Sequence, residues 1–449
     1  MNIKRFYLIV LFILLLIFQT SAQYSVPPKM KWWYNDRFGM FIHFGSYSFL
    51  GHGEWAFSIE KWSKQDYQTN VTAKFDPIHF NAKEIADLAK RAGMKYLVIT
   101  AKHHEGFSMW DTHVASFKDV TGTKFYDLPQ FTKFGQRDIL KELRDACRLD
   151  GIKFGLYYSI LDWNHASQTI SETNGQMYST MKSTEACADY IRDMKAQLKE
   201  LIDRYHPDIL WFDGDWTYNS NEPTLNSWWT KSDGIDLYKF LVRLNPKLLI
   251  NERVFRGAGL GDWMCPEQKI PEKPESRPWE TCQTMNKSWG YNAADSDYKA
   301  PAVLIRQLVE VVSKDGNYLL NIGPKGDGSL TKQTVNILSE MGKWMDNNKQ
   351  SIYAATRSPF AVQPEWGYFT KRNGKLFIHV FYWPQNGTLE IPALANRIKK
   401  IYLLNNPEKL LTYQLTSSII KIEIPHNAPD KINSIMVVEV NGIPKAKAN

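Results

Sequence analysis

Short apolar runs alternate with amphipathic segments from about Phe38 to Trp344, and this order limits the possible folds more than any other feature of the sequence. Strands that alternate with helices indicate a parallel sheet. The expected strands are Gly39–Phe44, Tyr96–Thr100, Phe154–Tyr158, Ile209–Asp213, Leu248–Asn251 and Tyr318–Ile322. The expected helices are Ala82–Arg91, Asp138–Leu149, Ala186–Tyr205, Ile235–Leu244 and Ala302–Val312.

A (β/α)8 barrel with one or two unrecognised strands fits this pattern over about 300 residues. A doubly wound open sheet is the alternative. No Gly-x-Gly-x-x-Gly opens a helix after the first strand, which gives a dinucleotide-binding fold little support. We therefore assign residues 24–353 to an α/β catalytic barrel.

The pattern of apolar and polar residues changes after about Tyr353. The following runs are short, alternating and β-branched, and Gly, Asn and Pro separate them. They are Leu376–Trp383, Thr388–Ile391, Ile398–Leu404, Ile419–Ile424 and Ser434–Val440. This pattern predicts a small antiparallel β-sandwich over residues 354–449.

The first 23 residues are typical of a secretory signal peptide. Lys4 and Arg5 precede an apolar stretch of 13 residues, shorter than the roughly 20 that span a bilayer. Ser21 and Ala22 then supply small residues for cleavage. An uncleaved anchor is the alternative. We expect an exported protein, periplasmic or secreted, with no membrane span after cleavage.

The formal net charge of +8 is scattered, without a run of five Lys or Arg residues. Such a distribution affects solubility and does not define a nucleic-acid groove, so we expect no nucleic-acid partner. The four cysteines match no metal-binding spacing. Cys265 and Cys282 flank a Pro-rich loop, where they could form a disulfide or remain buried thiols.

The run Ile209–Asp213 ends in a carboxylate followed by Gly214. Barrel enzymes present catalytic groups at the C-terminal ends of strands, so Asp213 is a candidate nucleophile, base or metal ligand. A turn cap is the alternative role. Asp215 competes with it two residues later, but Gly214 indicates that the chain has already turned, and we prefer Asp213.

Three histidines also follow predicted strands. His43 ends the first strand, and His103 and His104 follow the second. Adjacent residues of a strand point to opposite faces, so His103 and His104 reach one ligand only if the chain bends there. No His-x-x-x-His is present, which leaves a metal site without support. Hydrogen bonding to a polyol fits better than three separate core histidines.

Aromatic and charged residues accompany these strand ends. Glu54 and Trp55 lie in a loop after the first strand, Tyr157 and Tyr158 end the third, and Arg253 follows the fifth. Aromatic residues make up 14 % of the chain. Flat rings pack on sugar faces, but they also fill ordinary cores. Each of these residues alone could serve packing or a surface ion pair.

A retaining glycosidase would need a second carboxyl about 5–5.5 Å from the nucleophile. The candidates lie between residues 257 and 290, and spacing alone does not choose among them. They are Asp262, Glu267, Glu272, Glu275 and Glu280.

An ordered set of motifs between about residues 30 and 330 resembles the α-L-fucosidases of glycoside hydrolase family 29. The motifs are Phe38 to Gly45 (FGMFIHFG), Gly53 to Trp55 (GEW), Lys102 to Phe107 (KHHEGF), Tyr157 to Ser159 (YYS), Leu210 to Asp213 (LWFD), Trp279 to Cys282 (WETC), Ser288 to Tyr291 (SWGY) and Asn317 to Pro324 (NYLLNIGP). One such motif would be weak evidence, whereas eight in order are strong. The stretch from Glu280 to Tyr291 is similar to the broad-specificity branch.

The resemblance implies a catalytic barrel followed by a β-sandwich, and retaining hydrolysis of terminal α-L-fucose on fucosylated glycans without metal or cofactor. It implies Asp213 as the nucleophile. Glu267 takes the place of the acid/base by analogy, and Glu280 in the more regular Trp-Glu motif is the alternative. The implied sugar-binding residues are His43, Glu54, Trp55, His103, His104, Tyr158, Trp211, Arg253 and Trp289. Tyr158 is preferred over Tyr157. The rival interpretations are a non-catalytic fucose lectin on a degenerate barrel and another exported barrel glycosidase.

Overall fold

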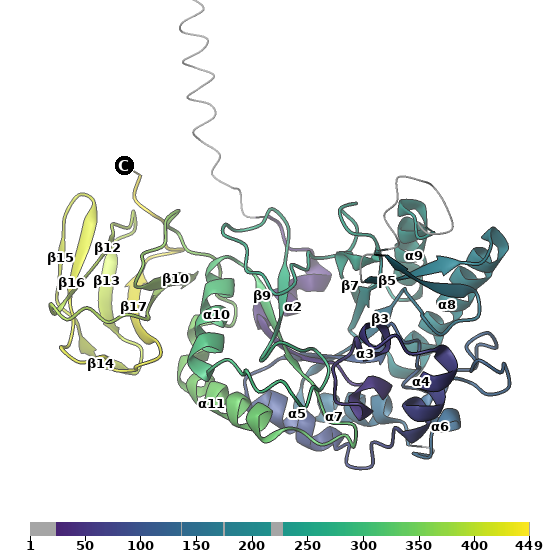
Figure 1. Cartoon of the computed structure of the whole chain (residues 1–449). Helices are drawn as coiled ribbons and strands as arrows, with labels where there is room; N and C mark the ends of the chain where they lie inside the picture. Colours follow the sequence, from purple (N-terminus) through teal and green to yellow (C-terminus); the bar gives the residue numbers. More distant parts are fainter. Residues whose placement is uncertain (1–23, 136, 174–175, 217–227, 449) are drawn as a thin grey trace, which may run out of the picture.

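The computed structural model describes residues 24–135, 137–173, 176–216 and 228–448 (Figure 1). The predicted signal peptide lies outside these residues. Across the part of the chain that is described, no helix combines the length and the apolarity needed to cross a bilayer.

A curled sheet of seven strands forms the main body, in the order β7-β6-β3-β2-β1-β9-β8 with every pairing parallel. Five of its strands match the sequence prediction closely, and β6 matches it residue for residue. β7 is shorter than predicted, and β8 was not recognised from the sequence. The strands are β1 (Phe38–Ile42), β2 (Tyr96–Lys102), β3 (Lys153–Ser159), β6 (Ile209–Asp213), β7 (Leu249–Ile250), β8 (Glu280–Thr284) and β9 (Asn317–Ile322).

An irregular segment closes the curled sheet between its two edge strands, β7 and β8. Trp263 pairs with Asn251 after β7, and Met264 and Glu267 pair with Trp279 and Cys282 at β8, all in parallel. The segment 263–267 therefore occupies the eighth position of a barrel, which confirms the predicted fold class.

Alternation along the strands divides the apolar side chains into an inner and an outer set. Phe41, Tyr157 and Trp211 belong to the cluster inside the barrel. Tyr158 and Phe212, their chain neighbours, belong to the cluster between the sheet and the helices. The strands are therefore apolar on both faces, as parallel strands covered by helices must be.

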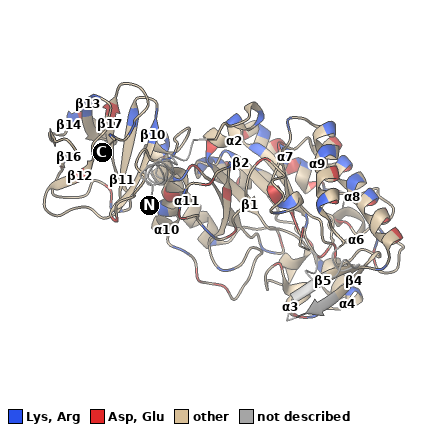
Figure 2. Ribbon diagram, turned by 90° about the horizontal axis from the view of Figure 1, so that it is seen from above, with Lys and Arg blue, Asp and Glu red and all other residues tan. Residues whose placement is uncertain are grey.

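The helices pack around the outside of the sheet (Figure 1). The periodicity correctly predicted five of them: α5 (Ala82–Arg91), α7 (Ile139–Asp150), α8 (Thr184–Tyr205), α9 (Lys231–Leu244) and α10 (Pro301–Ser313). It did not predict α11 (Lys332–Asn348). The short helices are α2 (Lys31–Asp36), α3 (Ala56–Ile59), α4 (Lys64–Asn70) and α6 (Leu128–Phe131). Seen from above, the positions of basic and acidic residues are interspersed along the ribbons of the outer helices (Figure 2).

A hairpin of β4 (Gln168–Thr173) and β5 (Gln176–Met181) extends from the C-terminal end of β3. It was not predicted.

Two antiparallel sheets follow α11, in the orders β10-β11-β17-β13-β14 and β12-β16-β15. Apolar residues such as Phe369, Ile391 and Ile422 fill the layer between them, which confirms the predicted sandwich. Phe377 and Val437 lie on the other face of the larger sheet and join the core that includes α10 and α11. The strands are β10 (Gly367–Arg372), β11 (Lys375–Val380), β12 (Thr388–Pro392), β13 (Ile398–Leu403), β14 (Asn406–Leu410), β15 (Tyr413–Leu415), β16 (Ile419–Glu423) and β17 (Ser434–Val440).

The predicted boundary after residue 353 falls between the short 3-10 turn Lys349–Ser351 and β10. The division into domains stays a prediction, because the larger sandwich sheet packs against the same core as the barrel helices.

Candidate active site

A narrow cavity opens at the C-terminal ends of the barrel strands, where parallel strands deliver side chains from different parts of the chain. Six strands or the loops that follow them contribute to its wall. The lining residues are Phe41, His43, Trp55, His103, His104, Tyr157, Trp211, Asp213, Trp216, Arg253, Glu267, Cys282 and Trp289.

Asp213 ends β6 at the bottom of this cavity, as the sequence predicted. The chain turns at once, because Gly214 has a φ of 76° and a Cβ there would lie 2.8 Å from the Leu161 nitrogen. The Asp213 carboxylate accepts hydrogen bonds from Arg253 Nη1 at 2.8 Å, Arg256 Nη2 at 2.8 Å and the Tyr157 hydroxyl at 3.2 Å. Every contact therefore stabilises the ionised form.

Two opposing effects act on the Asp213 carboxyl. Burial alone would raise its pKa, but the positive charges of Arg253 and Arg256 lower it below the ordinary value. An ionised carboxylate at the end of a barrel strand is suited to nucleophilic attack on an electrophilic carbon.

Arg253 links the two candidate catalytic carboxylates. One terminal nitrogen donates to Asp213, and the other donates to Glu267 Oε2 at 2.9 Å. The guanidinium lies over the Trp211 ring, 4.6 Å from its centroid, and its side chain is 3 % exposed. The Glu267 side chain is 43 % exposed. The Arg253 guanidinium therefore lies between an enclosed carboxyl, that of Asp213, and a solvent-facing carboxyl, that of Glu267.

Glu280 lies elsewhere. Its carboxylate is buried beneath the cavity floor, where it accepts hydrogen bonds from Tyr96 Oη at 2.6 Å, Trp211 Nε1 at 3.1 Å and Trp33 Nε1 at 3.3 Å. Burial raises its pKa to about 7. Glu280 does not line the cavity, whereas Glu267 does. This geometry favours Glu267 over the alternative as the group that can reach a substrate.

The backbone bends just before the two adjacent histidines, His103 and His104. The pairing of β2 with β3 shifts register between Thr100 and Lys102. After this irregularity the rings of His103 and His104 lie side by side, with centroids 4.2 Å apart. Both line the cavity with His43. The bend is what allows two adjacent residues to reach one ligand.

Hydrogen bonds fix the orientation of two of these rings. His43 Nδ1 lies 2.7 Å from Asn321 Oδ1, and His104 Nδ1 lies 2.7 Å from Ser159 Oγ. The Asn321 amide nitrogen and the Ser159 hydroxyl each donate to a backbone carbonyl, so each histidine must be the donor. Nε2 of each ring is thus left as an acceptor.

Burial lowers the pKa of His43 to about 4 and that of His104 to about 4, and it lowers the pKa of His103 as well. All three rings are therefore neutral near pH 7. Neutral imidazoles can accept hydrogen bonds from sugar hydroxyls without adding positive charge to the site.

The structure corrects the choice between the two tyrosines. Tyr157 points into the barrel, stacks on Trp211 and His103, and donates to Asp213. Tyr158 points outward and donates to Gln197 Oε1 on α8 at 2.8 Å. Pairing in register would have identified the difference, because Tyr157 lies beside Trp211 and two residues before the partner of Asp213.

The remaining predicted residues divide into two groups. Trp55 and Trp289 line the cavity, and the Trp289 ring lies against His43. Glu54 is buried behind the wall, where its carboxylate accepts a hydrogen bond from the Gly290 amide at 2.8 Å. It therefore holds the loop that carries Trp289, and it is not part of the cavity lining.

Sequence reasoning did not find Arg256 and Trp216. The Arg256 guanidinium lies 4.9 Å from the centroid of the Trp216 ring at the rim of the cavity. Arg256 follows Arg253 by three residues across a 3-10 turn, Glu252–Val254. Phe255 between them is extended, so the position of Arg256 depends on the direction in which the chain leaves the turn, for which the sequence offered no signal.

Comparison with known proteins agrees with this geometry. The family model described as alpha-L-fucosidase matches residues 18–350. The chain belongs to this family, glycoside hydrolase family 29. It is 30 % identical to the human tissue alpha-L-fucosidase over 406 residues, covering 84 % of this chain and 81 % of the relative. The chain is therefore a glycoside hydrolase of the alpha-L-fucosidase type.

Solved family structures share the whole fold. Alpha-L-fucosidase isoenzyme 1 from Paenibacillus thiaminolyticus has a TM-score of 0.79 and 32 % identity, covering 92 % of this chain and 99 % of its own. A trapped covalent intermediate of a Bacteroides thetaiotaomicron alpha-L-fucosidase has a TM-score of 0.79 and 26 % identity, covering 93 % and 97 %. The barrel and sandwich of this fucosidase-family chain are thus those of its relatives.

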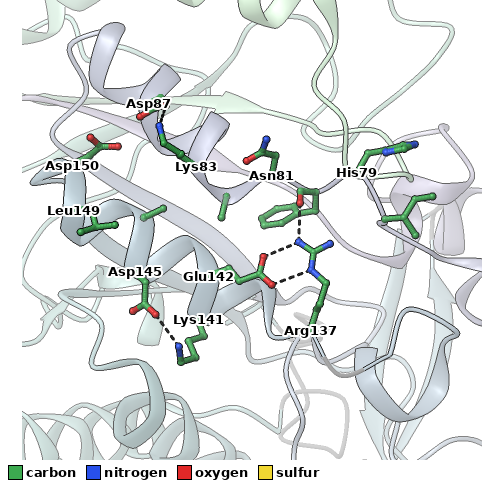
Figure 3. A pocket seen from close by; sticks show the side chains of 14 residues that line it. His79, Asn81, Lys83, Asp87, Arg137, Lys141, Glu142, Asp145, Leu149 and Asp150 are labelled. Atoms are coloured by element: carbon green, nitrogen blue, oxygen red, sulfur yellow. Dashed lines mark hydrogen bonds and ion pairs between the residues drawn. The ribbon is translucent and has the colours of Figure 1, made fainter.

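Two other features are not part of the site. Among the described residues, no three His, Cys, Asp or Glu side chains gather as metal ligands, and all four cysteines are free thiols. A larger hollow of about 820 Å³ lies on the outside of the barrel between α5 and α7 (Figure 3). Its ionic groups pair with one another, as in Arg137 with Glu142 and Lys141 with Asp145. It lacks the buried, desolvated groups of the strand-end cavity.

Proposed function

We propose that the protein is an exported, retaining exo-α-L-fucosidase that removes terminal α-L-fucose from glycans or glycoconjugates by double displacement. The observation that carries the proposal is the arrangement around Arg253, which contacts an enclosed carboxylate, Asp213, and a solvent-facing carboxylate, Glu267. Family membership supports the choice of sugar.

In the first step, an oxygen of ionised Asp213 attacks the anomeric carbon of the fucoside. The bond from this carbon to the leaving oxygen breaks, and the protonated Glu267 gives its proton to that oxygen. A covalent fucosyl-enzyme results. In the second step, ionised Glu267 takes a proton from water, and the water oxygen replaces Asp213 at the anomeric carbon. Fucose is released with net retention, and both carboxyls return to their starting states.

The neutral histidines bind the sugar in this proposal. Nε2 of His43 and Nε2 of His104, which lies 3.8 Å from Asp213 Oδ2, accept hydrogen bonds from fucose hydroxyls, while the Trp289 ring supplies an apolar wall. Hydrogen bonds that strengthen as the ring distorts contribute to rate as well as to binding.

A non-catalytic fucose lectin is the alternative from another class, and no observation favours it. It would keep the histidine and aromatic wall but would not need two carboxylates on one arginine. Another exported barrel glycosidase would keep both carboxylates and differ in sugar preference, which a panel of nitrophenyl glycosides would reveal.

The first experiment is hydrolysis of 4-nitrophenyl α-L-fucoside by the wild type and by Asp213→Gly, each with and without azide. We expect wild-type turnover, loss of turnover in the variant, and rescue by azide as β-fucosyl azide. A matched control is Asp208→Gly, because Asp208 precedes the same strand at its opposite end and pairs with Lys153. Full activity of Asp213→Gly would overturn its assignment, and no turnover by a folded wild type that binds fucose would favour the lectin.

Export is tested separately. Expression of the full chain should yield a mature protein outside the cytoplasm that begins near residue 23, as read by N-terminal sequencing. A cytoplasmic protein that retains Met1 would contradict it.

A further inference from the structure

The contacts of Arg256 differ from those of Arg253, although both guanidiniums donate to the same oxygen of Asp213. Arg253 is 3 % exposed and also binds a backbone carbonyl and Glu267. Arg256 is 41 % exposed, and its other partners are Asp215, 3.2 Å from Nε, and the face of Trp216. One arginine is fixed within the wall, and the other reaches the nucleophile from the rim.

The surroundings allow the Arg256 side chain to change position. It opens a glycine-rich loop in which Gly257 and Gly259 have positive φ, and a Cβ added at either glycine would meet no atom within 4 Å. The Arg256 backbone nitrogen is tied to Asp215 Oδ2 at 2.7 Å. The backbone is therefore anchored while the half-exposed guanidinium can rotate about its side-chain bonds.

The hydrogen bonds of Asp213 indicate where the Arg256 guanidinium would move when a substrate binds. Both guanidiniums bind Oδ1 of Asp213, whereas Oδ2 accepts, among the described residues, only the Tyr157 hydroxyl, so Oδ2 can attack while the guanidinium at the rim is released toward the substrate. Fucose entering the cavity would place its anomeric carbon against Asp213 and its leaving group toward the exposed rim. The rim on this side carries Arg256 and Trp216, so a displaced guanidinium meets the leaving group.

We propose that Arg256 is a specificity-determining residue, which binds Asp213 in the empty site and binds acceptor groups of the leaving group, carboxylates most strongly, once fucose occupies the cavity. This inference rests on the proposed function. A guanidinium forms charge-assisted, bidentate hydrogen bonds with a carboxylate, which a hydroxyl or an apolar group does not match. The enzyme should therefore favour fucosides whose leaving group carries an acidic substituent near the reacting oxygen.

The test compares two substrates, 4-nitrophenyl α-L-fucoside and its analogue with a carboxylate on the ring carbon next to the one that bears the glycosidic oxygen. For each enzyme we take the ratio of the two kcat/KM values, and comparing this ratio between variants cancels the intrinsic difference in leaving-group reactivity. The variants are Arg256→Gln, Arg256→Lys and the control Arg277→Gln. Arg277 donates to the carbonyls of Leu260 and Gly261 in the same loop but does not contact Asp213.

We expect Arg256→Gln to lower the ratio about fivefold or more, with a smaller decrease for Arg256→Lys and none for Arg277→Gln. An equal loss on both substrates would mean that Arg256 acts only on the nucleophile, and it would overturn the inference. So would an equal change of ratio in Arg277→Gln, which would assign the effect to the loop. If folded wild type turned over neither fucoside, the proposed function itself would fail, and the inference with it.

Discussion

The indole nitrogen of Trp211 lies 3.1 Å from a carboxylate oxygen of Glu280, although only Trp211 lines the cavity. Trp211 in turn supports the Arg253 guanidinium on one side and stacks on Tyr157. The buried carboxylate is thus three contacts away from Asp213, through Trp211 and then Arg253 or Tyr157. In the proposed mechanism, Glu280 would therefore position Trp211 and would not act as the catalytic acid.

Glu280→Gln should lower kcat/KM about 10- to 100-fold, because the amide nitrogen would face a donor and shift Trp211. Azide should not restore its activity. Glu267→Ala should instead keep measurable turnover of an activated aryl fucoside and be rescued by azide with retention, as expected for loss of the acid/base. Product analysis by NMR separates the two. Azide rescue of the Glu280 variant alone would reverse the assignment.

Tyr157→Phe and Tyr158→Phe form a matched pair, since the two substitutions remove one hydroxyl each from adjacent buried residues. Tyr157→Phe should lower kcat about tenfold, because Asp213 loses a hydrogen-bond donor. Tyr158→Phe should leave kcat unchanged and cost about 1–2 kcal/mol of stability, because Gln197 loses a buried partner. Steady-state kinetics and urea denaturation measure the two effects. A kinetic defect confined to Tyr158→Phe would favour Tyr158 as the site residue.

Glu105 should make stability depend on pH. Burial raises its pKa from 4.5 to about 8 in the folded chain. Below about pH 4.5 the group is protonated in both states, and as pH rises toward 8 only the unfolded chain ionises freely, so the folded state loses stability. Glu105→Gln should remove this loss and gain about 2–4 kcal/mol over wild type between pH 4.5 and 8.

The measurement for Glu105 is denaturant unfolding of both proteins at several pH values. Glu84→Gln, on the exposed side of α5, serves as the control and should show no such trend. A constant difference between wild type and Glu105→Gln across this range would show that Glu105 is ionised in the folded protein.

Asp315→Asn should destabilise the fold by about 3 kcal/mol, because it leaves the fully buried Arg37 without its counter-charge. Asn tolerates the positive φ of 72° at this position, so the effect reports the charge and not the backbone. Asp87→Asn removes one partner of an exposed pair with Lys83 and should leave the melting temperature unchanged. Equal melting temperatures for all three proteins would contradict the prediction.

Most strands and helices of the barrel could be predicted from the sequence, because strand burial and helix periodicity are local patterns. β6 and α5 were predicted with their observed bounds. β8 was missed because Glu280, Thr281 and Gln283 make it look polar, although its neighbours bury all five of its residues. The hydrogen bonds that permit this come from Trp33, Tyr96 and Trp211, which no local pattern connects to it.

The candidate site was predicted less completely. Strand ends identified Asp213 and the histidines, and the family resemblance supplied Glu267. Choosing Tyr158 failed because the inward face of β3 depends on its register with β6. Arg256 was missed because its role depends on a turn whose direction the sequence does not reveal.

The segment 263–267 is joined to the strands on either side of it only by isolated residue pairs. Each pairing between neighbouring strands of the seven-stranded sheet contains two or more consecutive residue pairs. Glu267 ends this weakly joined segment, and Asp213 ends a strand paired on both sides. The two carboxyls therefore differ in mechanical support as well as in exposure. Backbone amides around Glu267 should exchange with deuterium sooner than those of β6, and fluctuations at this seam would alter proton delivery while the attacking group stays in place.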